Sequence, residues 1–93
     1  MNSSYLKYTL PIKNYYLIKW FPFSRTNIHG HDGKQCDFII LNGSLSEKRY
    51  GINADVTESI LQKLKRYSIN DEIGAHSMHN TDDKVKWSLH RYR

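Results

Sequence analysis

Residues 28–43 read IHGHDGKQCDFIILNG, and they give the strongest indication of the fold class. Two histidines separated by one residue point to the same side of a β-strand, whereas they cannot share one face of a helix. Neutral imidazoles that converge from one face of a sheet form half of a transition-metal site. His29 and His31 therefore predict a strand that carries metal ligands. The run from Cys36 to Leu41 predicts a further strand, which ends at the turn dipeptide Asn42-Gly43.

A third histidine follows downstream in residues 73–80, which read IGAHSMHN. His76 completes a set of three imidazoles that can occupy one side of a metal ion, which leaves positions open for other ligands, as catalytic iron needs. We expect His79 to be a solvent-facing neighbour and not a ligand. For the pair of His29 and His31 alone, an equally good alternative is that they are surface histidines in a polar loop.

The length and the cysteine content limit the number of domains and the cellular compartment. Ninety-three residues fit one domain with one core, so we expect a single domain over residues 1–93. The one cysteine excludes an internal disulfide framework and fits a reducing compartment. No apolar stretch is long enough to span a bilayer, and no secretory signal is recognisable at the N-terminus. These features predict a cytoplasmic protein.

The charge balance indicates a basic surface. The chain has 14 Lys and Arg against 9 Asp and Glu, a formal net charge of +5. These residues are scattered, without a block of like charges, so we expect neither a nucleic-acid partner nor a membrane partner. The alternative is a basic β-barrel whose exposed tyrosines stack on the bases of a single strand.

The rest of the chain reads as short strands separated by turns, which predicts an all-β barrel or sandwich. We expect strands over Tyr15–Phe23, Ser44–Tyr50 and Val85–Tyr92, with Pro11 at an edge or in a turn. Residues 57–66 have two readings. Ile60, Leu61 and Leu64 fit helical spacing behind a Thr57 cap, but an extended segment from Leu61 is equally open.

Three motifs occur in a fixed order between about Trp20 and Tyr92. They are His29-x-His31-x4-Cys36-x6-Gly43, then Ile73-Gly74-x-His76-x3-Asn80, and finally Ser88-x-His90-x-Tyr92. In these residues the chain resembles cysteine dioxygenase, a non-haem iron thiol oxygenase of the cupin superfamily. Most cupins place a glutamate ligand where this chain has Cys36. The resemblance implies a minimal all-β cupin fold, a small barrel of the double-stranded β-helix type.

The resemblance also implies a role for each motif residue. His29, His31 and His76 would hold Fe(II), the expected cofactor, and Tyr92 would lie beside its open positions. Cys36 would lie within reach of a thioether link to Tyr92. His90 would hydrogen-bond the tyrosine hydroxyl, and Ser88 would orient His90. The implied reaction adds O2 to the sulfur of a small thiol to give a sulfinic acid.

Each residue also has a simpler reading. Cys36 could be a small buried apolar group, and Tyr92 could belong to a frayed chain end. Trp20 and Trp87 are expected to pack in the core rather than contact a substrate.

Two features depart from the family pattern. Family members bind the substrate carboxylate with an arginine in a Tyr-Thr-Arg context, whereas this chain has Tyr8-Thr9-Leu10, with Lys7 and Arg25 as the nearest cations. A leucine offers no donors to a carboxylate, so a non-catalytic metal-binding cupin is the alternative function. The chain is also shorter than the family pattern, and uncovered strand edges favour either a homo-oligomer or only moderate stability.

Overall fold

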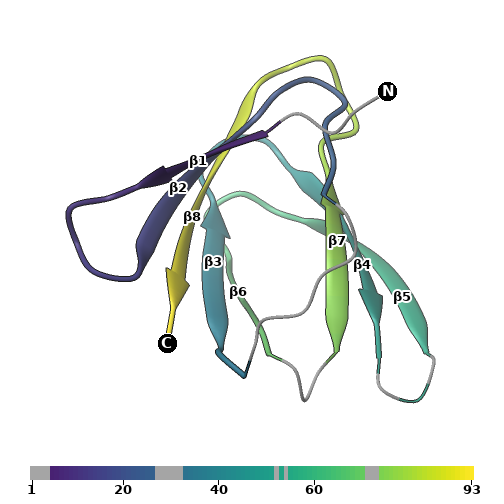
Figure 1. Cartoon of the computed structure of the whole chain (residues 1–93). Helices are drawn as coiled ribbons and strands as arrows, with labels where there is room; N and C mark the ends of the chain where they lie inside the picture. Colours follow the sequence, from purple (N-terminus) through teal and green to yellow (C-terminus); the bar gives the residue numbers. More distant parts are fainter. Residues whose placement is uncertain (1–4, 27–32, 52, 54, 71–73) are drawn as a thin grey trace.

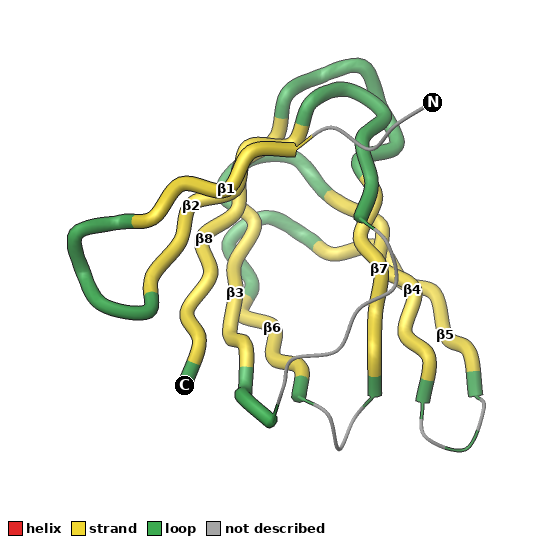
Figure 2. The backbone as a smooth tube through the Cα atoms, in the orientation of Figure 1, coloured by secondary structure: helices red, strands yellow, loops and turns green. Residues whose placement is uncertain are grey.

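The computed structural model describes residues 5–26, 33–51, 53, 55–70 and 74–93, and its regular structure there consists of β-strands alone (Figures 1 and 2). The strands are β1 (Tyr5–Thr9), β2 (Tyr15–Trp20), β3 (Cys36–Ile40), β4 (Leu45–Tyr50), β5 (Val56–Leu61), β6 (Arg66–Ile69), β7 (Ala75–His79) and β8 (Lys86–Tyr92). In this part of the chain no helix has the length and apolar character to cross a bilayer.

The strands form two antiparallel sheets that face each other (Figure 1). The five-stranded sheet has the order β1-β2-β8-β3-β6, and the three-stranded sheet has the order β5-β4-β7. The last strand, β8, lies between β2 and β3. Because β8 is hydrogen-bonded to a strand on each side, the C-terminal segment is an interior part of the sheet. Tyr92 is therefore the last residue of a paired strand, not part of a frayed end.

A buried apolar cluster fills the space between the sheets, because alternate side chains of each strand point inward. The members of this core are Ile18, Trp20, Cys36, Phe38, Ile40, Leu45, Leu61, Ile69 and Met78. Along β8 the inward positions are Lys86, Ser88 and His90, with Tyr92 partly buried at the end. The prediction that Ser88, His90 and Tyr92 share one face is thereby confirmed. Trp20 is buried as expected, whereas Trp87 lies on the opposite face of β8 and is partly exposed.

Residues 57–61 and 66 lie in strands, with a turn between them, so the helical reading of residues 57–66 is wrong. β5 pairs with β4 along its whole length, and β6 pairs with β3. Leu61 is buried, while Ile60 and Leu64 are 62% and 67% exposed, so these residues do not form one apolar face. Leu64 has a φ of 62°, in a turn before β6. Pairing with distant strands decides the conformation where local spacing allows two.

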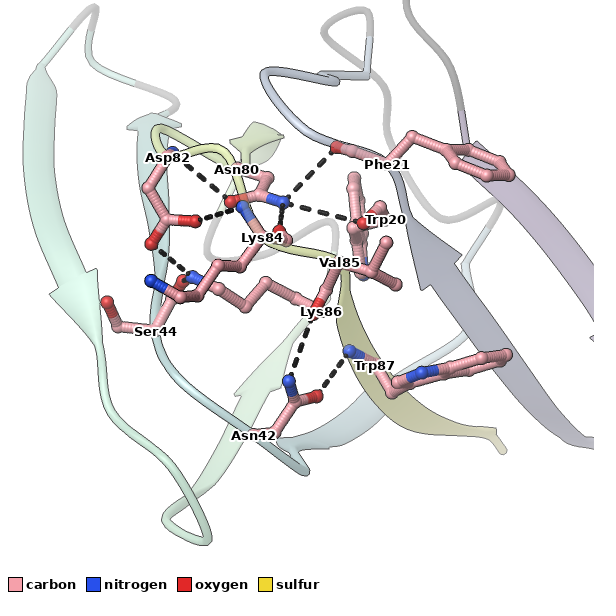
Figure 3. Close-up of polar contacts among 10 residues, drawn as sticks. All are labelled: Trp20, Phe21, Asn42, Ser44, Asn80, Asp82, Lys84, Val85, Lys86 and Trp87. Atoms are coloured by element: carbon pink, nitrogen blue, oxygen red, sulfur yellow. Dashed lines mark hydrogen bonds and ion pairs between the residues drawn. The ribbon is translucent and has the colours of Figure 1, made fainter.

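A polar cluster closes one end of the sandwich, where β7 passes into β8 (Figure 3). The amide of Asn80 is fully buried and donates to backbone carbonyls of Phe21 and Lys84 at 3.2 and 2.7 Å. The ammonium of Lys86 is buried too, and it contacts the Asp82 carboxylate at 2.7 Å and the Ser44 carbonyl at 3.0 Å. These contacts fix the 80–86 turn against both sheets.

The strand predicted to carry His29 and His31 lies outside the described residues. The other predicted strands are present with small differences at their ends. The strand expected over Tyr15–Phe23 ends at Trp20, and Cys36–Leu41 ends at Ile40. Such differences of one to three residues are common at strand ends.

Candidate metal centre

His76 lies on the inward face of β7 and is almost completely buried. Its Nδ1 is 2.8 Å from Oε2 of Glu47, an equally buried carboxylate on the inward face of β4. Arg49 holds the other carboxylate oxygen at 2.8 Å and donates to the Ser68 carbonyl on β6 at 2.8 Å. Burial alone would raise the pKa of Glu47, but the hydrogen bonds from His76 and Arg49 lower it below its usual value. Glu47 is thus a carboxylate that orients the imidazole.

This pairing is the arrangement found around metal-binding histidines. A ligating histidine usually bonds a carboxylate through one ring nitrogen, and this bond fixes the ring and its tautomer. Since Nδ1 of His76 faces Glu47, a metal ion bound by His76 would be held through Nε2. The residues present therefore fit the chemistry of a histidine metal site.

The two other proposed ligands, His29 and His31, lie outside the described residues. Among the residues that are described, no cluster of three His, Cys, Asp or Glu side chains could hold a metal ion. His79 lies on the outward face of β7, where it lines a groove of about 560 Å³ together with Arg25, Lys48 and Glu58. Arg25 thus belongs to this outer groove, and it does not stand in for the missing arginine.

A chain of polar contacts runs along the inward face of β8. Nε1 of Trp20 donates to the Ser88 hydroxyl at 2.8 Å, and that hydroxyl is 2.7 Å from Nε2 of His90. With one hydrogen bond accepted from Trp20, the Ser88 hydroxyl can direct its own hydrogen to His90. This favours the tautomer with hydrogen on Nδ1, and Nδ1 of His90 is 3.7 Å from Sγ of Cys36.

Cys36 and Tyr92 are directly opposite each other in the pairing of β3 with β8. The neighbouring residues Gln35 and Arg93 exchange both backbone hydrogen bonds, at 2.7 and 2.8 Å, so Cys36 and Tyr92 form a non-hydrogen-bonded pair. Side chains of such a pair are closer together than those of a hydrogen-bonded pair. A side-chain hydrogen bond joins Cys36 to Tyr92. The expected hydrogen bond between His90 and the Tyr92 hydroxyl stays a prediction.

Burial keeps both members of this pair neutral. It raises the pKa of the Cys36 thiol from 9.0 to about 11. Burial, followed by the neighbouring Cys36, also raises the pKa of Tyr92 well above its usual value of 10.0. At neutral pH the tyrosine hydroxyl therefore carries its proton and can donate it in a hydrogen bond.

Phe38 lies between His76 and the group formed by Cys36, His90 and Tyr92. Its ring stacks on His90 with centroids 5.2 Å apart, and it lies 6.2 Å from the ring of His76. Lys7 approaches the far side of the tyrosine, with Nζ 4.4 Å from the ring centroid of Tyr16 and 5.0 Å from that of Tyr92. The structure thus brings Cys36, Ser88, His90 and Tyr92 together and links them to His76 through one aromatic ring.

Sequence reasoning missed Glu47, Arg49 and Phe38. The available signal was alternation: if Leu45 points inward, Glu47 and Arg49 do so as well. A charge at an inward position needs a partner, so this pattern predicts a bonded carboxylate in the core.

Comparison with known proteins identifies relatives of the sequence and of the fold. The sequence model of the family described as cysteine dioxygenase type I matches residues 11–93. A comparison with curated proteins gave no match.

Several solved structures share the fold at low sequence identity. CENP-C of Drosophila melanogaster bound to CAL1 has a TM-score of 0.80 at 14% identity, over 96% of this chain and 72% of that chain. The cupin domain of CENP-C has a TM-score of 0.78 at 15% identity, over 96% and 68%. Oxalate oxidase has a TM-score of 0.74 at 11% identity, over 84% of this chain and only 40% of its own length. The fold is therefore a small all-β cupin sandwich.

Proposed function

Because the chain belongs to the cysteine dioxygenase type I family, we propose that it is an Fe(II)-dependent thiol dioxygenase. The proposed reaction adds both atoms of O2 to the sulfur of a small thiol and gives a sulfinic acid. The match over residues 11–93 carries this proposal. The inward placement of His76, Cys36, His90 and Tyr92 supports it.

We assign the metal to His29, His31 and His76. When bound there, Fe(II) would supply a redox-active Lewis acid with positions open for a thiol and O2. Glu47 would keep His76 in the tautomer that binds metal through Nε2, and Arg49 would keep Glu47 in place.

The remaining residues would position the substrate and protect the reaction from water. Tyr92 would donate a hydrogen bond from its protonated hydroxyl towards the reacting groups. Ser88 fixes the ring of His90, and His90 in turn faces the sulfur of Cys36. The closeness of Cys36 to Tyr92 supports a thioether link between them, which would replace the S–H bond and one ring C–H bond in a two-electron oxidation with O2 as the oxidant. The lone cysteine, being buried, suits a reducing compartment, so we assign the reaction to the cytoplasm.

The experiment is metal analysis combined with oxygen uptake. The purified protein is loaded with Fe(II) under argon and then given O2 with cysteine, cysteamine or mercaptopropionate. We expect about one iron per chain and a sulfinic acid product in the ratio of one to each O2 consumed. An iron-loaded protein that consumes no O2 with any thiol would contradict the proposal.

Two variants separate the assigned roles. His76→Ala should lose iron, whereas Tyr92→Phe should keep iron but turn over about 100-fold more slowly, because it loses one hydrogen-bond donor. His79→Ala is the matched control, since His79 lies on the outward face of the same strand. Loss of iron in the tyrosine variant would contradict these roles.

A second candidate function rests on one residue. Leu10 stands where the family pattern has an arginine, and it offers no donor to a carboxylate. This favours a cupin that binds metal without catalysis. The metal and oxygen-uptake experiment distinguishes the two functions, because a non-catalytic cupin would bind iron through His76 and oxidise none of the thiols.

A further inference from the structure

The outward face of the five-stranded sheet collects basic residues that lie far apart in the sequence. Lys19 on β2, Arg91 on β8 and Arg66 on β6 belong to this face, because each is paired with an outward residue of a neighbouring strand. Arg93 follows β8 and bonds Asp37 at 2.7 Å, and Asp37 is the one carboxylate among the outward residues of the five strands. This face is therefore strongly basic.

The outward face of the three-stranded sheet carries much less charge. There Lys48 on β4 lies directly opposite Glu58 on β5, and Arg25 is the one further cation that lines the groove on this face. The basic surface is thus a property of one sheet, and it does not follow from the net charge of +5 alone.

Aromatic rings lie among the cations of the basic face. Nζ of Lys19 is 5.5 Å from the ring centroid of Trp87, and the guanidinium of Arg91 is 6.0 Å from that of Tyr15. Tyr8 is 43% exposed, and its ring centroid lies 6.2 Å from that of Trp87. In the part of the chain that the structure describes, neither Lys19 nor Arg91 forms an ion pair with a carboxylate. Both charges are therefore open to an anionic ligand.

We propose that this face binds single-stranded nucleic acid, with phosphates on the cations and bases stacked on the rings. A basic surface with interleaved aromatic rings is typical of proteins that bind single strands, including those that bind them on a β-sheet. Scattered charges disfavoured such a partner in the sequence, but strand pairing gathers these charges on one face. The proposal does not depend on the oxygenase activity, because His76 and His90 lie on the inward side of the sheets.

A hollow between two arginines fits one nucleotide of such a strand. Its volume is about 240 Å³, and Arg66, Arg91, Tyr15, Ile39 and Leu89 are among the residues that line it. Ile39 and Leu89 are partly exposed and offer an apolar surface to a base, while the two guanidiniums can bind the phosphates on either side. A base seated there would cover apolar side chains that are unusual on a sheet face pointing away from the core.

Fluorescence anisotropy with labelled oligomers of about 12 nucleotides tests the proposal. The probes are oligouridylate, oligothymidylate and a duplex of mixed sequence. We expect dissociation constants of about 1–10 µM for the single strands at about 0.05 M salt. Phosphate contacts from Lys19, Arg66 and Arg91 should make the affinity fall about 20-fold between about 0.05 and 0.2 M salt.

The comparison between probes identifies what is recognised. The tighter of the two single strands shows which sugar is preferred. The duplex should bind at least about fivefold more weakly, because its bases are not free to stack on the rings. No change in anisotropy up to about 100 µM protein, or equal affinity for the duplex, would overturn the proposal.

Matched lysine substitutions on the two sheets locate the surface. Lys19→Gln should weaken binding about threefold to tenfold and lower the slope of log affinity against log salt by about 0.7, because one phosphate contact is lost. Lys48→Gln removes the same charge from a partly exposed position on the other sheet and should change affinity by less than about twofold. Equal losses in the two variants would show that net charge alone causes binding, and would contradict the assignment of this face.

A ring substitution tests the stacking. Tyr15→Leu should weaken binding at least about fivefold without changing the salt slope, because it removes a ring and no charge. Tyr50→Leu on the outward face of β4 is its control and should bind as the wild type does. Circular dichroism verifies that each variant is folded. Equal affinity of the two tyrosine variants would contradict the stacking.

An anionic lipid surface is the other partner that a basic, partly apolar face could bind. Vesicles of phosphatidylserine and phosphatidylcholine test this by sedimentation. Protein that sediments with these vesicles and binds none of the oligomers would replace the proposal.

Discussion

Asn80 shows how one buried amide stabilises the turn between two strands. Its nitrogen lies 2.7 to 3.4 Å from the backbone carbonyls of Trp20, Phe21 and Lys84 (Figure 3). Replacing it by alanine leaves these carbonyls without their donor, and we expect Asn80→Ala to lower the free energy of unfolding by about 2 kcal/mol. Urea denaturation followed by circular dichroism measures this loss.

Two further variants make this prediction specific to the amide donor. Asn80→Asp should destabilise by about 3–5 kcal/mol at neutral pH, because it places a carboxylate against the same carbonyls. Asn42→Ala removes contacts to Val85 and Trp87 at an exposed position and should cost about 1 kcal/mol or less. If Asn42→Ala cost as much as Asn80→Ala, burial would not be the cause.

Cys36 predicts a loss of stability at alkaline pH for protein prepared without metal. Burial raises the pKa of this thiol in the folded state to about 11, from 9.0 in the unfolded chain. The folded state therefore binds more protons than the unfolded state between these values, and stability falls as pH rises through them. The full effect is about 3 kcal/mol, all of it present below pH 9. Urea denaturation at pH 8, 9, 10 and 11 measures the slope.

The matched control is Cys36→Ala. It should be less stable than the wild type at pH 8 because it lacks the packed sulfur, but its stability should fall less steeply above pH 9. Tyr92 contributes a slope of the same sign in both proteins, because its pKa is also raised by burial. If the free energy of unfolding of the wild type and of Cys36→Ala fell in parallel with pH, the Cys36 thiol would not titrate with the expected pKa.

At the scale of the elements, the junction between β4 and β7 depends on Gly74. This residue has a φ of 134°, and a Cβ atom added there would lie 2.2 Å from the carbonyl oxygen of Tyr50. Gly74→Ala must move the end of one strand, and we expect it to lower the free energy of unfolding by about 3 kcal/mol or more.

Gly33 is the matched control for that substitution. It has a φ of 77°, but nothing lies within 4 Å of an added Cβ. Gly33→Ala should therefore cost only the backbone strain of about 1–2 kcal/mol. Thermal unfolding compares the two variants, and equal losses would show that the contact with Tyr50 has no role.

Strand faces could be predicted from the sequence because the two-residue period is local. Ser88, His90 and Tyr92 share a face in any strand that contains them, whatever its neighbours. Their partners could not be predicted in this way. Cys36 meets Tyr92 because β3 pairs with β8 in one register, and residues 48 to 56 positions apart set that register. Local spacing in residues 57–66 also allowed two conformations, and pairing with β4 selected one.

At the scale of the molecule, the candidate centre lies between the two sheets. The five-stranded sheet supplies Cys36, His90 and Tyr92, and the three-stranded sheet supplies His76 and Glu47. The sequence motifs indicated the histidine and the cysteine but not Glu47, which looks like one charge among several in residues 45–50. The carboxylate becomes distinctive only when the packing of the sheets buries it beside His76.

A metal ion that binds His76 in the space between the sheets should stabilise the whole fold. A ligand that binds only the folded state raises the free energy of unfolding, by about 3 kcal/mol at a hundred times its dissociation constant. We therefore expect Fe(II) under argon, or redox-inert Zn(II), to raise the melting temperature by about 12–24 °C at that concentration. A chelator should reverse this shift. Differential scanning fluorimetry measures it without any thiol or O2, so the result is independent of catalysis.

The variants distinguish this site from weak binding elsewhere. His76→Ala should abolish the shift. Glu47→Gln should reduce metal affinity about 10- to 100-fold, because a neutral amide accepts a weaker hydrogen bond and holds the imidazole ring of His76 less firmly. Glu58→Gln removes a carboxylate from the outward face of the same sheet and should leave the shift unchanged. A full shift in His76→Ala would place the metal elsewhere and remove the ligand assignment on which the proposed oxygenase depends.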